Sequence, residues 1–178
     1  MSDDQKRDAA LAEAVRLREQ GEAGQARERL VALAERYPED AEVAYQTAWV
    51  HDMLGLESGA VPFYERALGG AGLSRKDRRG AFLGLGSTYR VLGRYGSAVE
   101  TLSRGLEEFP EDPALQTFLS MALYNVGEGR EAVRLLLRTL TATSGDPGVR
   151  DYRRAIEYYA DDLDAVWQPD EKPEEPEG

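Results

Sequence analysis

The chain has 178 residues, carries a net charge of −11 and contains no cysteine. The lack of cysteine excludes disulfides, thiolate metal sites and a cysteine nucleophile, and the acidic balance argues against a nucleic-acid partner, because phosphate binding depends on clustered Lys and Arg. The first twenty residues are charged throughout, so we expect no secretory signal, and no apolar run approaches the ~20 residues of a membrane helix. We therefore expect a cytoplasmic protein without membrane contact.

An internal repeat is the strongest signal in the sequence. Four glycines recur at spacings of 34, 38 and 34 residues, namely Gly21, Gly55, Gly93 and Gly127. An alanine follows each glycine by five positions (Ala26, Ala60, Ala98, Ala132), and a large apolar residue follows by nine (Leu30, Tyr64, Leu102, Leu136). A small residue precedes each glycine by seven positions (Ala14, Ala48, Gly86, Ser120). This pattern predicts helix, tight turn and second helix in each unit, with the units stacked on one another.

The expected helices follow the chain in pairs: 5–20 with 24–36, 41–54 with 58–68, 75–92 with 96–108, and 113–126 with 130–142. A ninth helix is predicted after Pro147, capped by Asp146 and running to about Trp167. Its apolar stripe and polar outer side suit a unit that closes a solenoid. The segment 168–178 is acidic and contains several prolines, so we expect it to be disordered.

The repeat resembles the tetratricopeptide repeat. The third unit matches that pattern best, through Leu85, Gly86, Tyr89, Gly93, Ala98, Leu102 and Pro110. The resemblance implies an all-α, right-handed superhelical solenoid of about four hairpins plus a capping helix. The implied repeats are 7–40, 41–74, 79–112 and 113–146, followed by the capping helix at 147–167 and the acidic segment at 168–178. The whole chain also resembles small stand-alone bacterial proteins of this type.

The resemblance further implies that the first helix of each hairpin lines a groove that binds a protein or peptide. The candidate groove residues are Arg18, Tyr45, Trp49, Asp52, Ser87, Arg90, Thr117, Met121, Tyr124 and Asn125, accompanied by Leu11, Val15 and Leu83. Aromatic residues and arginine dominate binding hot spots. One hypothesis is a segment anchored by Trp49 and Tyr124, with Arg90 meeting an acidic group. The alternative is that Trp49 packs between hairpins and Arg90 pairs with Asp52. The Lys and Asn of the family's carboxylate clamp are missing from the corresponding positions.

Other functions find less support in the residues. His51 and Asp52 are adjacent, so on a helix they do not face each other, and we expect His51 to be a packing residue. We expect no enzyme activity, no catalytic residues, no metal and no cofactor. Self-association into a homodimer is the main alternative to groove binding, through Leu11, Val15 and Leu17 or through Tyr152, Tyr158 and Tyr159. The acidic segment either promotes solubility or folds back on Arg18 and Arg90.

Overall fold

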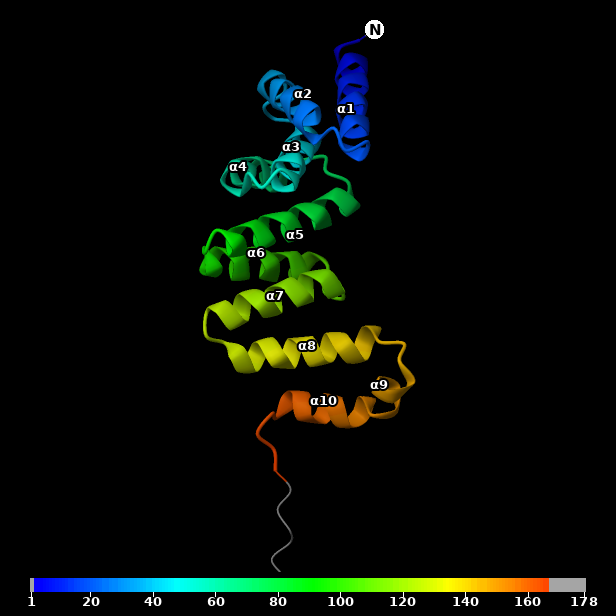
Figure 1. Ribbon diagram of the computed structural model, residues 1–178, viewed down its shortest axis with the longest axis vertical. Coiled ribbons are helices and arrows are strands. Elements are labelled where there is room, and N and C mark those ends of the chain that lie inside the picture. Colours follow the sequence, from blue (N-terminus) through cyan, green and yellow to red (C-terminus); the bar gives the residue numbers. More distant parts are fainter. Residues whose placement is uncertain (1, 167–178) are drawn as a thin grey trace, which may run out of the picture.

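The computed structural model describes residues 2–166 and contains ten helices in that range, without strands. They are α1 (Asp3–Glu19), α2 (Ala23–Arg36), α3 (Ala41–Met53), α4 (Glu57–Gly69), α5 (Arg75–Val91), α6 (Tyr95–Glu108), α7 (Pro113–Asn125), α8 (Gly129–Thr143), α9 (Pro147–Asp151) and α10 (Arg153–Asp161). Figure 1 shows them stacked in chain order along one long axis. The predicted all-α solenoid is confirmed. In the described part of the chain, none of the helices combines the length and hydropathy needed to cross a membrane.

The repeated glycines end the first helix of each hairpin. All four have positive φ, between 68° and 89°. At Gly21 this conformation lets the next amide, of Glu22, donate back to the carbonyl of Leu17 at 2.9 Å. Glycine adopts this left-handed geometry without a steric clash. The turn then supplies hydrogen bonds to carbonyls that have no partner at the end of the helix. The prediction that these glycines close tight turns is confirmed.

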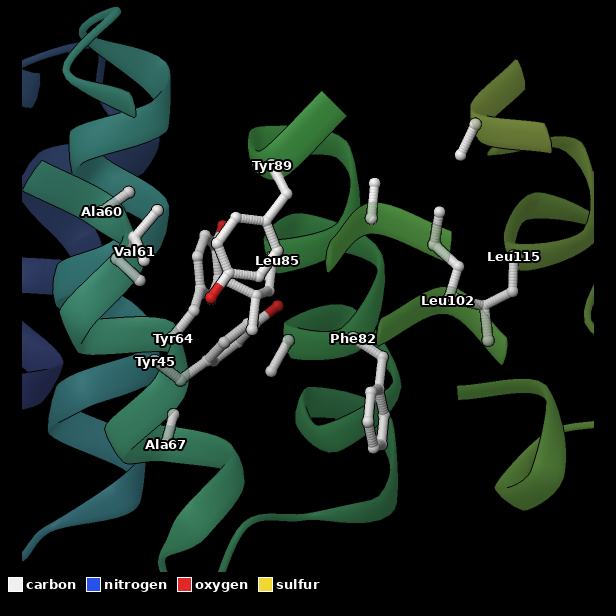
Figure 2. Close-up of a cluster of buried hydrophobic side chains, with 14 of the residues drawn as sticks. Tyr45, Ala60, Val61, Tyr64, Ala67, Phe82, Leu85, Tyr89, Leu102 and Leu115 are labelled. Atoms are coloured by element: carbon white, nitrogen blue, oxygen red, sulfur yellow. The ribbon is translucent and has the colours of Figure 1, made fainter. Parts of the chain in front are cut away.

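The hairpins pack through the predicted columns of small and large residues. Leu30, Tyr64 and Leu102 are buried, and the alanine column is buried throughout. Figure 2 shows Tyr45 and Tyr64 extending from the second hairpin toward α5. The two tyrosines lie over Gly80 and Gly84, where added Cβ atoms would come within 2.2 Å of Tyr45 Oη and 2.4 Å of Tyr64 Cζ. Two glycines one turn apart therefore seat the tyrosines of the preceding hairpin.

Leu136, the fourth member of the large column, departs from its predicted role. It is 41% exposed and does not fill the space before the next helix. The segment that follows α8 also differs from its prediction. The predicted ninth helix is instead two helices, α9 and α10, which meet at Tyr152, and α10 ends at Asp161. The Asp162 side chain accepts the amide of Asp164 at 3.2 Å, a local bond that competes with helix continuation.

The C-terminal helix packs on α8 and is joined to it by ion pairs. Arg138 pairs with Asp161, and Arg130 pairs with Asp164. The predicted cap at Asp146 is confirmed, since its carboxylate accepts the amide of Val149. The predicted disordered segment 168–178 lies outside the described residues.

The first helices form the inner layer of the solenoid. Helix α1 contacts α3, α3 contacts α5, and α5 contacts α7. Two arginines tie first helices of successive hairpins together. Arg7 donates to both carboxylate oxygens of Asp40 at 2.7 and 2.8 Å, and Arg79 makes the equivalent bidentate pair with Asp112. Asp40 and Asp112 also cap α3 and α7, so each carboxylate stabilises a helix and a junction.

Replacing Asp112 with alanine is expected to lower the free energy of unfolding by about 1–2 kcal/mol at pH 7, mainly through loss of the helix cap. Burial alone would raise the pKa of Asp112, but the hydrogen bonds from Arg79 and the Leu115 amide outweigh it, and the net pKa is lowered. A carboxylate with a lowered folded-state pKa stabilises above its unfolded pKa and stops doing so as the pH falls through the folded value. Denaturant titrations at several pH values should therefore show the difference from wild type shrinking below about pH 4.

Asp112→Asn is the matched control for that measurement. It retains an oxygen that can accept the amide of Leu115 but removes the charge that pairs with Arg79. Because partly exposed ion pairs contribute about 0–1 kcal/mol, this variant should lose less stability than the alanine variant. Equal losses would show that the ion pair, and not the cap, carries the effect.

Candidate functional site

The first helices of the three N-terminal hairpins enclose an open cavity of about 630 Å³, here called the N-terminal cavity. Its walls come from α1, α3 and α5, with side chains from α4 and α7 at its edges. Half of the candidate groove residues converge on it, namely Arg18, Tyr45, Trp49, Asp52 and Ser87. Cavities of 300–1,000 Å³ are typical of ligand pockets, so this one is large enough to receive several residues of another chain.

Trp49 and Arg18 form the centre of this cavity. The guanidinium carbon of Arg18 lies 3.7 Å from the centroid of the Trp49 ring, and the ring of Tyr45 lies 5.9 Å away on the same helix. An N–H of Arg18 donates to the Gln46 side chain. Trp49 thus packs between the first and second hairpins, yet its side chain stays 40% exposed to the cavity. The cation–π contact holds the indole in place and leaves part of its surface free to contact a ligand.

Asp52 lies one turn beyond Trp49 and is held by hydroxyl groups. Tyr64 donates to it at 2.8 Å and Thr88 at 3.0 Å. The alternative in which Arg90 pairs with Asp52 is therefore wrong, because the two hydroxyls, and not Arg90, supply the hydrogen bonds of this carboxylate. Burial raises the pKa of Asp52, and the hydrogen bonds from Tyr64 and Thr88 offset that effect only in part. Asp52 therefore lines the cavity without a cationic partner in the described chain, and a ligand that enters the cavity would contact its carboxylate.

We expect Asp52→Asn to be at least as stable as wild type at pH 7. A carboxylate with a raised folded-state pKa binds protons more readily when folded, so wild-type stability falls as the pH rises through that pKa. The amide keeps an oxygen that can accept from Tyr64 and Thr88 and removes the charge. The measurement is the free energy of unfolding from pH 4 to 7, in which the wild type should decline relative to the variant as the pH rises. A variant that is clearly less stable at pH 7 would contradict this account of the carboxylate.

A second depression, here called the C-terminal hollow, lies between α5, α7 and α8 and measures about 360 Å³. It brings together the candidate residues Arg90, Met121, Tyr124 and Asn125. Tyr124 is 72% exposed, and the apolar side chain of Leu136 adds to the wall. Arg90 Nε and Asn125 Oδ1 are buried and have no hydrogen-bond partner among residues 2–166. The hollow thus combines an apolar wall with one unused donor and one unused acceptor.

The two depressions are neighbours on α5. Ser87 lines the N-terminal cavity and Arg90 lines the C-terminal hollow. Residues three apart on a helix lie side by side, about 5–6 Å between Cβ atoms. The candidate residues therefore form two adjacent sets along the inner layer, and not one uniform groove.

Two of the positions assigned to the groove lie elsewhere. Thr117 lines neither depression, and its hydroxyl donates to the carbonyl of Pro113 at 2.7 Å. Leu11 is buried in the core of the first hairpin with Leu30 and Leu33, so neither groove binding nor a dimer surface can use it. The remaining apolar members, Val15 and Leu83, do line the N-terminal cavity.

Several cavity residues were missed from the sequence. Each of Glu19, Gln46, Met53 and Phe118 directly follows a residue assigned to the groove, so widening each position by one would have found them. Lys76 and Arg79 also line the cavity. They lie in the first turns of α5, outside the positions assigned to the groove.

His51 and Asp52 have separate surroundings. The His51 ring is buried 5.2 Å from the ring of Phe63, and its Nδ1 lies 2.7 Å from the carbonyl of Thr47. Its Nε2 accepts from Arg27 at 3.3 Å. Since a carbonyl can only accept, Nδ1 carries the proton in this arrangement. The histidine therefore packs against α4 and α2, whereas Asp52 faces the N-terminal cavity.

These features define a helical-repeat protein whose inner layer presents two depressions. The family model described as Tetratrico peptide repeat matches residues 41–163, which is most of the chain. The chain therefore belongs to the tetratricopeptide repeat family, whose fold supports protein–protein interaction modules. No curated protein sequence matches it.

Solved structures agree with this fold. A crystal structure of MamA superposes with a TM-score of 0.68 at 17% identity, covering 94% of this chain and 81% of that one. MamA from Desulfovibrio magneticus RS-1 gives 0.64 at 19% identity, covering 90% and 91%. YrrB, described as a TPR protein with an unusual peptide-binding site, gives 0.67 at 23% identity, covering 88% and 82%. At these identities the likeness concerns the fold alone.

Proposed function

We propose that this protein binds an extended segment of another protein along its inner layer, from the N-terminal cavity to the C-terminal hollow. The observation that carries the proposal is the exposed part of Trp49, fixed by Arg18 inside a cavity of about 630 Å³. A pre-positioned aromatic side chain offers large contact area at little further loss of entropy. The YrrB description, a peptide-binding protein of the same fold, is consistent with this use.

The C-terminal hollow supports the same proposal through its polar groups. A peptide backbone presents one N–H donor and one C=O acceptor per residue. Arg90 Nε and Asn125 Oδ1 supply the complementary donor and acceptor, and both lack partners among the described residues. Tyr124 and Leu136 provide an apolar contact beside them. Rotation of the Arg90 and Asn125 side chains toward the hollow would let an extended segment use all three features at once.

The test is affinity capture from the native host's lysate with two baits and a control bait. One bait is the wild type, and the other carries Trp49→Ala, Arg90→Glu and Tyr124→Ala, after circular dichroism has shown that both fold. Tyr95→Ala, which removes an exposed tyrosine from α6 in the outer layer, is the matched control. A protein enriched by the wild type and the control but lost by the triple variant supports the proposal. Equal enrichment by all three baits would show that the interface lies outside the inner layer.

Self-association is a second candidate, favoured by one observation. Tyr152 and Tyr158 are 69% and 66% exposed at the C-terminal end of the solenoid. Exposed aromatic side chains that share one end of a molecule can pack against a second copy. If this surface forms a dimer, Tyr152→Ser with Tyr158→Ser should abolish a concentration-dependent rise in mass measured by light scattering. A wild type that stays monomeric at high concentration would remove this candidate.

A further inference from the structure

Arg18 is a buried cation without an anionic partner. It is 5% exposed and is the only Lys or Arg among the buried residues of the described chain. No carboxylate within residues 2–166 forms an ion pair with it, whereas Arg7 and Arg79, which also line the inner layer, each pair with an aspartate. Its guanidinium contacts the Trp49 ring and donates to the Gln46 side chain, which are both uncharged. Burial lowers the pKa of Arg18, and the charges of Glu19 and Asp77 offset that effect only in part.

The geometry defines what such a group would bind. A guanidinium presents its N–H donors as a planar fork that matches a carboxylate, and charge-assisted pairs of this kind are among the strongest hydrogen bonds in proteins. The carboxylates that line the cavity beside Arg18 are otherwise engaged or turned away, and Asp52 accepts from Tyr64 and Thr88. Asp77 accepts from Ser74 at 2.8 Å, and Glu19 is the exposed neighbour of Arg18 on the same helix. Neighbouring residues on a helix do not face each other.

This chain itself contains a segment of the complementary chemistry. Segment 168–178 carries five carboxylates, on Asp170, Glu171, Glu174, Glu175 and Glu177, against one Lys, and it includes Pro169, Pro173 and Pro176. Proline-containing segments dock in grooves lined by aromatic residues. The N-terminal cavity supplies such a lining through Tyr45, Trp49 and Phe118.

Helix α1, which carries Arg18, and helix α10, which is followed by Val166, lie toward opposite ends of the solenoid (Figure 1). Packed helices lie about 8–10 Å apart, and the contacts that lead from α10 through α8, α7, α5 and α3 to α1, which carries Arg18, therefore span about 40–50 Å. The carboxylates follow Val166 by four to eleven residues, which reach at most about 13–40 Å when fully extended. Full extension therefore brings only Glu177, the last of them, to the lower limit of this path, and the others fall short of Arg18 within one molecule. A second molecule imposes no such constraint.

We propose that segment 168–178 of one molecule enters the N-terminal cavity of another, with a carboxylate on Arg18 and a proline against Trp49. This inference rests on the proposed function, because it makes this chain one of the segments that the cavity accepts. The contact is head-to-tail: one end of each molecule meets the other end of the next. Such a contact leaves a free cavity and a free segment at the ends of every assembly, so assemblies grow with concentration.

The test uses three full-length variants and analytical ultracentrifugation over a wide concentration range. Arg18→Gln removes the guanidinium and its planar set of N–H donors. A segment variant replaces Asp170 with Asn and the four glutamates with Gln, and it alters none of the described residues. Arg29→Gln removes the same charge from an exposed position on α2 and serves as the control. Wild type and Arg29→Gln should associate with increasing concentration, while the other two variants should require at least about tenfold higher concentration.

Mixing the two impaired variants gives the sharper result. Arg18→Gln keeps an intact segment, and the segment variant keeps an intact cavity, so together they should form a 1:1 complex that does not grow further. Arg18→Lys, which keeps the charge but loses the fork, should also be weakened, and this guards against misfolding of the Gln variant. Association of both impaired variants like the wild type, a wild type that is monomeric throughout, or a mixture without a complex would each overturn the proposal. Capture of a foreign protein by the segment variant would then still support the proposed function.

Discussion

Leu102→Ala is expected to lower the free energy of unfolding by about 2–5 kcal/mol, the range for truncating a fully buried leucine. Leu102 is completely buried in the main core, where it lies against Gly86 of α5. A Cβ added at Gly86 would come within 2.4 Å of the Leu102 Cγ. No space is therefore left between α5 and α6 at this level, and the loss of the leucine leaves a cavity that the helices cannot easily close. Chemical denaturation measured by circular dichroism gives the value.

A double-mutant cycle tests whether this pair sets the distance between the two helices. Gly86→Ala alone is expected to cost about 1–3 kcal/mol by overpacking, even though alanine favours a helix. In the Leu102→Ala background the added methyl group enters space that the truncation has vacated, so its cost should vanish or reverse. Additive effects of the two substitutions would show that Gly86 and Leu102 do not compete for the same space.

Gly84→Ala is expected to destabilise the protein by about 1–3 kcal/mol and to change the N-terminal cavity. The new Cβ would lie 2.4 Å from Tyr64 Cζ and Oη, so the ring must move away from α5. That movement breaks the hydrogen bond from Tyr64 to Asp52. The measurement is the free energy of unfolding, together with the Tyr64 and Asp52 signals in NMR spectra.

Gly24→Ala is the control for this prediction. Gly24 lies in α2 with no atom within 4 Å of the added Cβ, so alanine should stabilise by up to about 1 kcal/mol through helix propensity alone. Equal effects at the two positions would contradict the view that Gly84 is required to seat Tyr64.

The fold could be predicted from the sequence because its determinants are local and repeated. A glycine with positive φ, a small residue seven positions before it and an alanine five positions after it have the same physical meaning in each unit. Their recurrence in one register therefore identified the hairpins, although the family model itself matches only from residue 41 onward. The break at Tyr152 was not foreseeable in the same way, because the apolar periodicity runs through it.

The candidate site was predictable only at the level of helix faces. The positions of Trp49 and Tyr124 on the inner layer follow from the repeat register. The burial of Arg18 does not, because it depends on Gln46 and Trp49, which come from another hairpin. The separation into a cavity and a hollow depends on how neighbouring helices pack. These are tertiary features that a single sequence does not encode in any short pattern.

The most direct test of the central claim is site-specific photo-crosslinking in the host. A benzophenone amino acid would replace Tyr124 on the inner layer or, as the matched control, the exposed Tyr95 on α6. Irradiation is expected to join a partner protein to the Tyr124 variant and not to the Tyr95 variant, and Trp49→Ala is expected to weaken the Tyr124 product. Crosslinking of the same partner from Tyr95 alone would contradict binding along the inner layer.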